Sequence, residues 1–170
     1  MSVRVTLNRE RLDTGQVGRI PCMPDRSQTV TERPDADGRP LKVLHVDDDP
    51  MNLRVVQEIL GAFGHHGVMA NSGEEALERL ATEAFDIMLV DIHMPVMTGI
   101  EVVRFLRASG GPQRDLPVIA LTADVYSRRP AEYLALGFND FVSKPILVAG
   151  LMQTIKRCVQ ARTMALSRAG

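Results

Sequence analysis

The pattern of apolar and polar positions changes at residue 41. From there on, short apolar runs alternate with longer stretches in which apolar residues recur every three or four positions. A short run that is apolar throughout is typical of a strand buried on both faces, and the longer period is typical of an amphipathic helix. The short runs predict five strands, at 42–46, 68–70, 86–91, 117–122 and 140–143.

Capping residues predict where the first helices of this alternation begin. Asp49 is a good N-cap and Pro50 a good first helical residue. Ser72, followed three positions later by Glu75, has the pattern of a capping box. Thr98 is an N-cap candidate for a third helix that carries Val102, Val103, Phe105 and Leu106. We therefore expect a helix after each of the first three strands.

The last two helices are predicted from proline and from apolar spacing. A helix begins at Pro130 and runs to 137, with Leu134 facing inward, because proline is tolerated only in a first turn. A fifth helix follows Pro145. Its inner face carries Leu147, Leu151, Met152, Ile155, Cys158 and Val159. Strands that alternate with helices in this way form a parallel sheet with right-handed crossovers.

Residues 1–40 differ in composition from the rest. Apart from a short alternating run at 2–7, they are rich in Arg, Asp, Pro, Gly and Thr and lack apolar periodicity. Such a segment buries too little surface to offset its ordering entropy, so we expect a flexible tail or linker. The predicted organisation is a tail at 1–40, a domain at 41–162 and a short C-terminal tail at 163–170.

Composition narrows the functional classes. A net charge of −1 and a pI near 6.4 argue against nucleic-acid binding driven by bulk charge. No apolar run approaches the roughly 20 residues that a membrane span needs. Cys22 and Cys158 have no metal-binding or redox spacing, which favours reduced thiols and a cytoplasmic location. His45 is expected to be a hydrogen-bonded interior residue, and His65 and His66 are expected in a loop.

Polar residues follow four of the five predicted strands. Asp47 and Asp48 follow the first strand, Asp91 ends the third, Thr122 ends the fourth and Lys144 follows the fifth. Because the carboxyl ends of parallel strands lie at one edge of a sheet, these side chains should converge. This convergence is the central prediction from the sequence.

Such a cluster has a definite chemistry. Two carboxylates about 4 Å apart repel each other by roughly 4 kcal/mol at an effective dielectric constant near 20. Lys144 supplies one compensating charge, and a hard divalent cation such as Mg²⁺ suits an all-oxygen ligand set. A carboxylate beside Mg²⁺ and a lysine is arranged to attack a phosphoryl group, and the product would be an aspartyl phosphate.

These residues resemble the receiver domain of bacterial response regulators. The matching pieces are VDD at 46–48, LVDIHMPVMTG at 89–99, LTA at 121–123 and SKP at 143–145, in this order. The resemblance covers residues 41 to about 162. It implies a three-layer (βα)5 doubly wound, flavodoxin-like sandwich around a five-stranded parallel sheet. It also implies Mg²⁺-dependent phosphorylation in a two-component phosphorelay.

The resemblance assigns roles to individual residues. Asp91 would be the phosphoacceptor and would also ligate Mg²⁺. Asp48 would bind the metal directly and Asp47 through water, and the backbone carbonyl of His93 would be a further ligand. Lys144 would pair with a phosphoryl oxygen.

The resemblance also implies a switch. Thr122 would hydrogen-bond the phosphoryl group and move inward on activation, and Phe141 matches an aromatic position that changes rotamer. The Lys144–Pro145 peptide bond would be cis. His93 and Asp124 occupy positions that tune dephosphorylation in the family.

The expected function is phosphoacceptor signalling without an output domain, because few residues follow the fifth helix. The domain would catalyse only its own phosphorylation and dephosphorylation. Its partners would be a sensor histidine kinase or a histidine phosphotransfer protein. A target protein would contact the face formed by the fourth helix, fifth strand and fifth helix. We expect a monomer or weak homodimer that binds neither nucleic acid nor membrane.

Three alternatives remain open. The run at 2–7 resembles the last strand of a histidine-kinase ATPase domain, so the chain could be the receiver fragment of a hybrid kinase. A phosphatase of the haloacid dehalogenase kind would use Asp47 and Asp49, but its further acid pair is missing after Lys144. The third is a receiver-like interaction module that is never phosphorylated.

Overall fold

The computed structural model describes residues 39–123 and 130–169. Strands and helices alternate along the chain, as the apolar pattern predicts. Residues 1–38 of the segment assigned to an N-terminal tail lie outside the described residues, and so do the strand predicted at 2–7 and Asp124. The elements are β1 Lys42–Val46, α1 Pro50–Ala62, β2 His66–Ala70, α2 Gly73–Thr82, β3 Ile87–Asp91, α3 Gly99–Ala108, β4 Val118–Thr122, α4 Pro130–Ala135, β5 Asp140–Ser143 and α5 Val148–Ala169.

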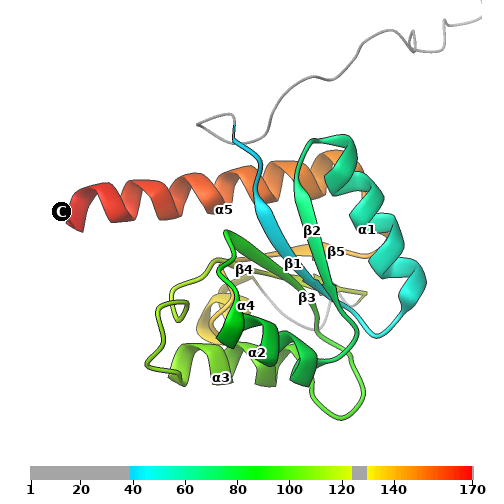
Figure 1. Cartoon of the computed structure of the whole chain (residues 1–170), viewed down its shortest axis with the longest axis horizontal. Coiled ribbons are helices and arrows are strands. Elements are labelled where there is room, and N and C mark those ends of the chain that lie inside the picture. Colours follow the sequence, from blue (N-terminus) through cyan, green and yellow to red (C-terminus); the bar gives the residue numbers. More distant parts are fainter. Residues whose placement is uncertain (1–38, 124–129, 170) are drawn as a thin grey trace, which may run out of the picture. The chain divides into compact units, whose positions relative to one another are not determined.

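The five strands form one parallel sheet in the order β2-β1-β3-β4-β5 (Figure 1). β3 lies in the centre, and all five of its residues are buried because helices cover both faces of the sheet. Helices α1 and α5 pack one hydrophobic cluster against one face, and α2, α3 and α4 pack a second cluster against the other. This three-layer arrangement confirms the predicted fold class.

The predicted N-caps are present. The side chain of Asp49 accepts a hydrogen bond from the amide of Met51, and Pro50 is the first residue of α1. Thr98 forms a complete capping box with Glu101. These caps start α1 and α3 immediately after the loops that follow β1 and β3, so they fix the lengths of both loops.

The capping box predicted for α2 forms only in part. The hydroxyl of Ser72 accepts from the amide of Glu75, as expected. The Glu75 carboxylate, however, accepts from the amide of Asn71 and pairs with Arg79, and not with the Ser72 amide. An arginine one turn along the helix therefore competes for the carboxylate that would close the box.

Two predicted core residues are exposed. The side chain of Leu134 is 58% exposed, and the buried residue of α4 is instead its neighbour Tyr133. The helix has only six residues, too few for apolar spacing to define its inner face. Leu147 is 71% exposed because it precedes the first residue of α5. The segment expected to be a C-terminal tail continues α5 as far as Ala169.

Candidate functional site

The predicted strand-end residues come together at the carboxyl edge of the sheet. Strands β1, β3, β4 and β5 are neighbours in the sheet, and Asp47, Asp91, Thr122 and Lys144 lie at their carboxyl ends or directly after them. The hydrogen bond from the Lys144 amide to the Thr122 carbonyl, at 2.7 Å, extends the pairing of β4 and β5 by one residue. The convergence expected from the sequence is therefore a property of the fold.

Lys144 joins the two buried carboxylates of this cluster. Its Nζ donates to Oδ2 of Asp47 and to Oδ2 of Asp91, both at 2.8 Å. The side chains of Lys144, Asp47 and Asp91 are 19%, 0% and 10% exposed. Burial of the ammonium lowers the pKa of Lys144, but hydrogen bonds and the charges of both carboxylates outweigh burial and raise it overall. Lys144 is therefore held in its charged form.

The second oxygen of Asp47 is bound by the beginning of α1. Oδ1 accepts from the amide of Asp49 at 3.0 Å and from Nδ2 of Asn52 at 3.1 Å. The buried carboxylate of Asp47 is thereby fixed by three donors, counting Lys144. Sequence reasoning missed Asn52. Its position in the first turn of a helix that begins at Pro50 was the signal that could have found it.

Asp48 supplies the third carboxylate. One oxygen from each of Asp47, Asp48 and Asp91 lies within 4.8 Å of the others, and Asp48 is exposed while the other two are buried. Three carboxylate oxygens this close together fit a hard divalent cation. Two of the three carboxylates already share a single lysine, so the cluster carries more negative than positive charge and favours a cation.

The loop after β3 holds Asp91 in place. The amide of His93 donates to Oδ1 of Asp91 at 3.3 Å, and the His93 side chain is exposed. The chain then returns so closely that a Cβ on Gly99 would lie 2.2 Å from the carbonyl oxygen of Asp91. Only glycine fits there, which gives Gly99 a steric role beside its role as a helix-starting residue.

Thr122 and Phe141 lie on the neighbouring strands. Thr122 is 1% exposed at the end of β4. Phe141 is partly buried in β5, where it stacks on Tyr133 of α4 with ring centroids 5.0 Å apart. The Lys144–Pro145 peptide bond is cis, as expected. The stacking partner Tyr133 was missed by sequence reasoning, which placed Leu134 inward instead.

His45 lies on β1, two residues before Asp47, and is 1% exposed. Within the described part of the chain, neither ring nitrogen has a hydrogen-bond partner, so the expectation of a hydrogen-bonded histidine is wrong. Burial lowers its pKa to about 4, with the charge of Asp47 opposing and that of Lys144 adding to the shift. His65 lies in the loop between α1 and β2, as expected, where it is buried and its Nδ1 accepts from the Leu41 amide. The expectation for His66 is wrong, because His66 begins β2.

None of the helices in the described residues is long and apolar enough to span a membrane.

Solved structures similar to this chain include chemotaxis protein CheY4 of Vibrio cholerae, with 31% identity, a TM-score of 0.65 and coverage of 71% of this chain and 99% of that one. The receiver domain of sensor histidine kinase PA1611 of Pseudomonas aeruginosa has 29% identity, a TM-score of 0.65 and coverage of 72% and 99%. That structure has a magnesium ion coordinated in its active site cleft.

Curated relatives include the aerobic respiration control sensor protein ArcB of Escherichia coli K12, 36% identical over 79% of this chain and 18% of the relative. Sensory/regulatory protein RpfC of Xanthomonas campestris is 36% identical over 69% and 16%. The chain thus spans less than a fifth of these relatives. The sequence model of the response regulator receiver domain family matches residues 43–156 of this chain. The chain therefore belongs to the response regulator receiver domain family, whose members act in two-component phosphorelay signalling.

Proposed function

We propose that Asp91 is the phosphoacceptor of this receiver domain. The observation that carries the proposal is the placement of Lys144 between Asp47 and Asp91, at 2.8 Å from each. A carboxylate oxygen of Asp91 attacks the phosphorus of a phosphohistidine or acyl phosphate. The bond from phosphorus to the leaving nitrogen or oxygen breaks, and its electron pair stays with the leaving group. The product is an acyl phosphate on Asp91.

The chain's own residues stabilise this transfer. Lys144 is held charged beside Asp91, so its ammonium can pair with a phosphoryl oxygen as negative charge develops. The Thr122 hydroxyl is proposed to hydrogen-bond another oxygen. Mg²⁺ would be held by Asp48 and Asp91, by Asp47 through water and by the His93 carbonyl, and when bound it neutralises phosphoryl charge.

Apolar side chains around the site support a protein donor. Met51 and Val55 in the first turns of α1 are 65% and 44% exposed. Val96, in the loop after β3, is 93% exposed, and Leu147, in the loop after β5, is 71% exposed. These elements flank the carboxyl edge, where a phosphohistidine must approach Asp91. We propose that a sensor histidine kinase or a histidine phosphotransfer protein covers this rim, in the context of a hybrid kinase or a separate regulator.

A second partner face is proposed for the output, over α4, β5 and α5. Phe141 of β5 stacks on Tyr133 of α4. Because β5 pairs with β4, which ends at Thr122, this stack links the α4 part of the face to the strand that carries Thr122. Inward movement of Thr122 would leave space for Phe141 to turn, which would break the stack and change the surface offered to a target.

The phosphoacceptor is tested by intact mass after incubation with Mg²⁺ and acetyl phosphate. The wild type should gain one phosphoryl group that hydroxylamine removes, and Asp91→Asn should gain none. Asp49→Asn is the matched control, because it removes an acid at the same edge while asparagine still caps α1. Absence of an adduct, together with absence of binding of beryllofluoride, would contradict the proposal and favour an interaction module that is not phosphorylated.

The protein donor is tested with a phosphorylated histidine phosphotransfer domain from a hybrid kinase. Val55→Glu should slow transfer from this protein donor and leave labelling by acetyl phosphate unchanged, because Val55 lies on the rim and outside the carboxylate cluster. The control is Gln153→Glu, which adds the same charge at an exposed position of α5 away from the rim. Equal slowing by both variants would argue against the rim as the donor surface.

A further inference from the structure

Arg107, in the last turn of α3, is half-buried and uses every hydrogen-bond donor of its guanidinium. Nε and Nη2 donate to the carbonyl oxygen of Gly137 at 3.0 and 2.8 Å, and Nη2 also donates to Oδ1 of Asn139 at 3.1 Å. Nη1 donates to the carbonyl oxygens of Arg114 and Leu116. An arginine has five N–H donors, so these five bonds leave none unused. Phosphoryl transfer itself does not require this arrangement.

The acceptors of Arg107 belong to the loop before β4 and to the turn between α4 and β5. These are the strands that carry Thr122 and Phe141. Asn139 joins the two segments, because its amide donates to the Val118 carbonyl and its Oδ1 accepts from the Val118 amide, both at 2.8 Å. One arginine of α3 therefore connects the starts of both strands.

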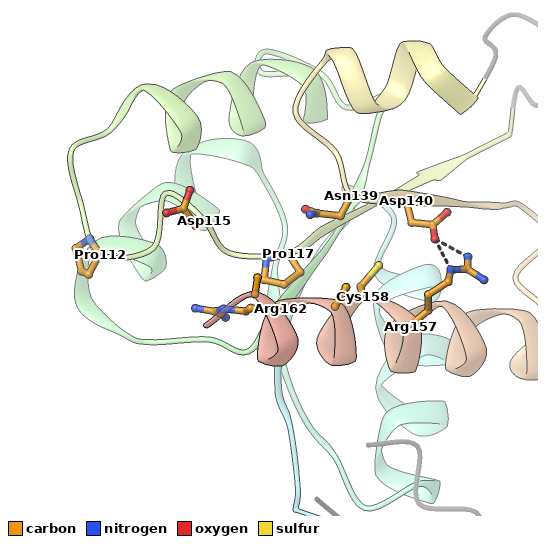
Figure 2. A pocket seen from close by; sticks show the side chains of 10 residues that line it. Pro112, Asp115, Pro117, Asn139, Asp140, Arg157, Cys158 and Arg162 are labelled. Atoms are coloured by element: carbon orange, nitrogen blue, oxygen red, sulfur yellow. Dashed lines mark hydrogen bonds and ion pairs between the residues drawn. The ribbon is translucent and has the colours of Figure 1, made fainter. Parts of the chain in front are cut away.

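The turn at 137–140 is held close to helices on both faces of the sheet, and we call it the anchored turn. A Cβ on Gly137, which has a φ of 100°, would lie 3.0 Å from Cγ1 of Val103 on α3. From the opposite face, Nε of Arg157 on α5 donates to Oδ2 of Asp140 at 2.9 Å (Figure 2). This ion pair is more exposed to solvent, so it is the weaker of the two restraints.

The anchored turn supports one side of Tyr133. The ring of Phe138, within the turn, meets the Tyr133 ring edge to face with centroids 6.2 Å apart, and the Phe138 amide donates to the Tyr133 carbonyl at 3.1 Å. Tyr133 therefore has two aromatic neighbours, Phe138 in the anchored turn and Phe141 in the proposed switch. If Phe141 turns away, Tyr133 keeps its contact with the anchored turn.

We propose that Arg107 is a positioning residue of the switch, and that the anchored turn is the fixed end about which α4 reorients. This role rests on the proposed function, because it gives a route for the change that Thr122 starts beside Asp91. When Phe141 leaves the stack, the end of α4 next to the turn stays in place and the rest of the helix moves. The output face then changes by a rotation of α4, while the turn keeps its position.

This role requires the planar fork of an arginine. The guanidinium contacts two segments at once, whereas the ammonium of a lysine is a single point with three donors. Arg107→Lys therefore keeps the charge but cannot bridge the loop before β4 and the anchored turn. Arg104→Lys is the matched control, because Arg104 lies on the same helix and is exposed.

The anchor is tested first in the wild-type full chain, by two-dimensional NMR with Mg²⁺ and beryllofluoride. The Nε–H signal of Arg107 reports directly on its bond to Gly137, and the amide signal of Tyr133 reports on α4. Beryllofluoride should shift the Tyr133 signal and leave the Arg107 signal in place and slow to exchange with solvent. A shift of the Arg107 signal as large as that of Tyr133 would overturn the anchor. This measurement needs no variant, so it stands even where a variant fails to fold.

The variants are compared by Tyr133 fluorescence in a Tyr126→Phe background. Arg107→Lys should lose most of the change that beryllofluoride causes, because α4 then has no fixed end to turn about, and Arg104→Lys should retain it. A purely structural role of Arg107 would lower the melting temperature and leave the fluorescence change intact. That result would overturn the assignment of Arg107.

The amide signals of His93 and Lys144 separate this inference from the proposed function, because both residues lie beside Asp91. If beryllofluoride shifts these signals but not that of Tyr133, the site binds the ligand and the anchored switch is wrong. If neither these signals nor that of Tyr133 shift, the proposed function fails and the inference fails with it.

Discussion

Lys144 and Asp47 are 97 positions apart in the sequence, yet the Nζ of Lys144 lies 2.8 Å from an oxygen of a carboxylate that has no solvent exposure. Removing the lysine leaves this buried charge without its partner. Lys144→Gln should therefore lower the free energy of unfolding by about 3 kcal/mol in the absence of divalent cations, as measured by urea denaturation in EDTA. Lys156→Gln, at an exposed position of α5, is the control and should have little effect. A loss no larger than that of the control would show that Asp47 is not stabilised by Lys144.

Magnesium should stabilise the folded chain, because the carboxylate cluster exists only in the folded state. At ten times the dissociation constant, the expected gain is about 1.4 kcal/mol, seen as a rise in melting temperature. Asp48→Asn should reduce this rise. Asp49→Asn should retain it, since Asp49 caps α1 and its oxygens are not part of the cluster. An equal reduction in both variants would assign the effect to general charge at this edge.

His45 should make the fold sensitive to acid. Burial lowers its pKa in the folded chain to about 4, whereas the ordinary value in the unfolded chain is 6.5. As the pH falls from 6.5 to 4, the unfolded state binds a proton that the folded state does not. Stability is therefore lost across this window, by about 3 kcal/mol in total.

Urea unfolding in EDTA at pH 7 and pH 5 measures this contribution. His45→Leu should lose less stability between the two values than the wild type, because it has no imidazole to protonate. His66→Gln, an exposed histidine at the start of β2, should behave like the wild type. A decline in His45→Leu as steep as that of the wild type would assign the acid sensitivity to the carboxylates.

The stack of Phe141 on Tyr133 provides an optical test of the proposed switch. The chain has no tryptophan and two tyrosines, so Tyr126→Phe leaves Tyr133 as the only emitter. Beryllofluoride binding should change Tyr133 fluorescence as Phe141 leaves the stack. Thr122→Ala should remove the change, and Phe105→Leu, at an exposed aromatic of α3, should preserve it. If the change persists in Thr122→Ala, the threonine does not couple the site to the stack.

The sequence was most informative where a residue pattern corresponds to a single structural element. Buried runs predicted the strands, and the parallel topology then brought Asp47, Asp91 and Lys144 to one edge without any pairwise information. It was least informative where the outcome depends on packing between elements. Whether Tyr133 or Leu134 faces the sheet depends on how a six-residue helix lies over β5, and periodicity over six residues does not define that.

Hydrogen-bond partners across elements show the same limit. Asn52 reaches Asp47 only because Asp49 and Pro50 start α1 at one particular residue. His45 has no hydrogen-bond partner among the described residues, and its own sequence neighbours do not reveal this. The same limit applies to cavities. The pocket beside α5 is lined by residues within 112–117, 139–140 and 157–165, and the sequence does not show that these three segments meet.

Asp86 marks both the entry and the exit of the domain. Arg39 contacts its carboxylate just before β1, and Arg162 contacts its carbonyl near the end of α5. Both connections therefore lie at the edge opposite Asp91, with the strands between them (Figure 1). Further polypeptide, such as a fused fluorescent protein, can therefore be joined at either end of the domain. The surface around Asp91 then remains open to a second molecule.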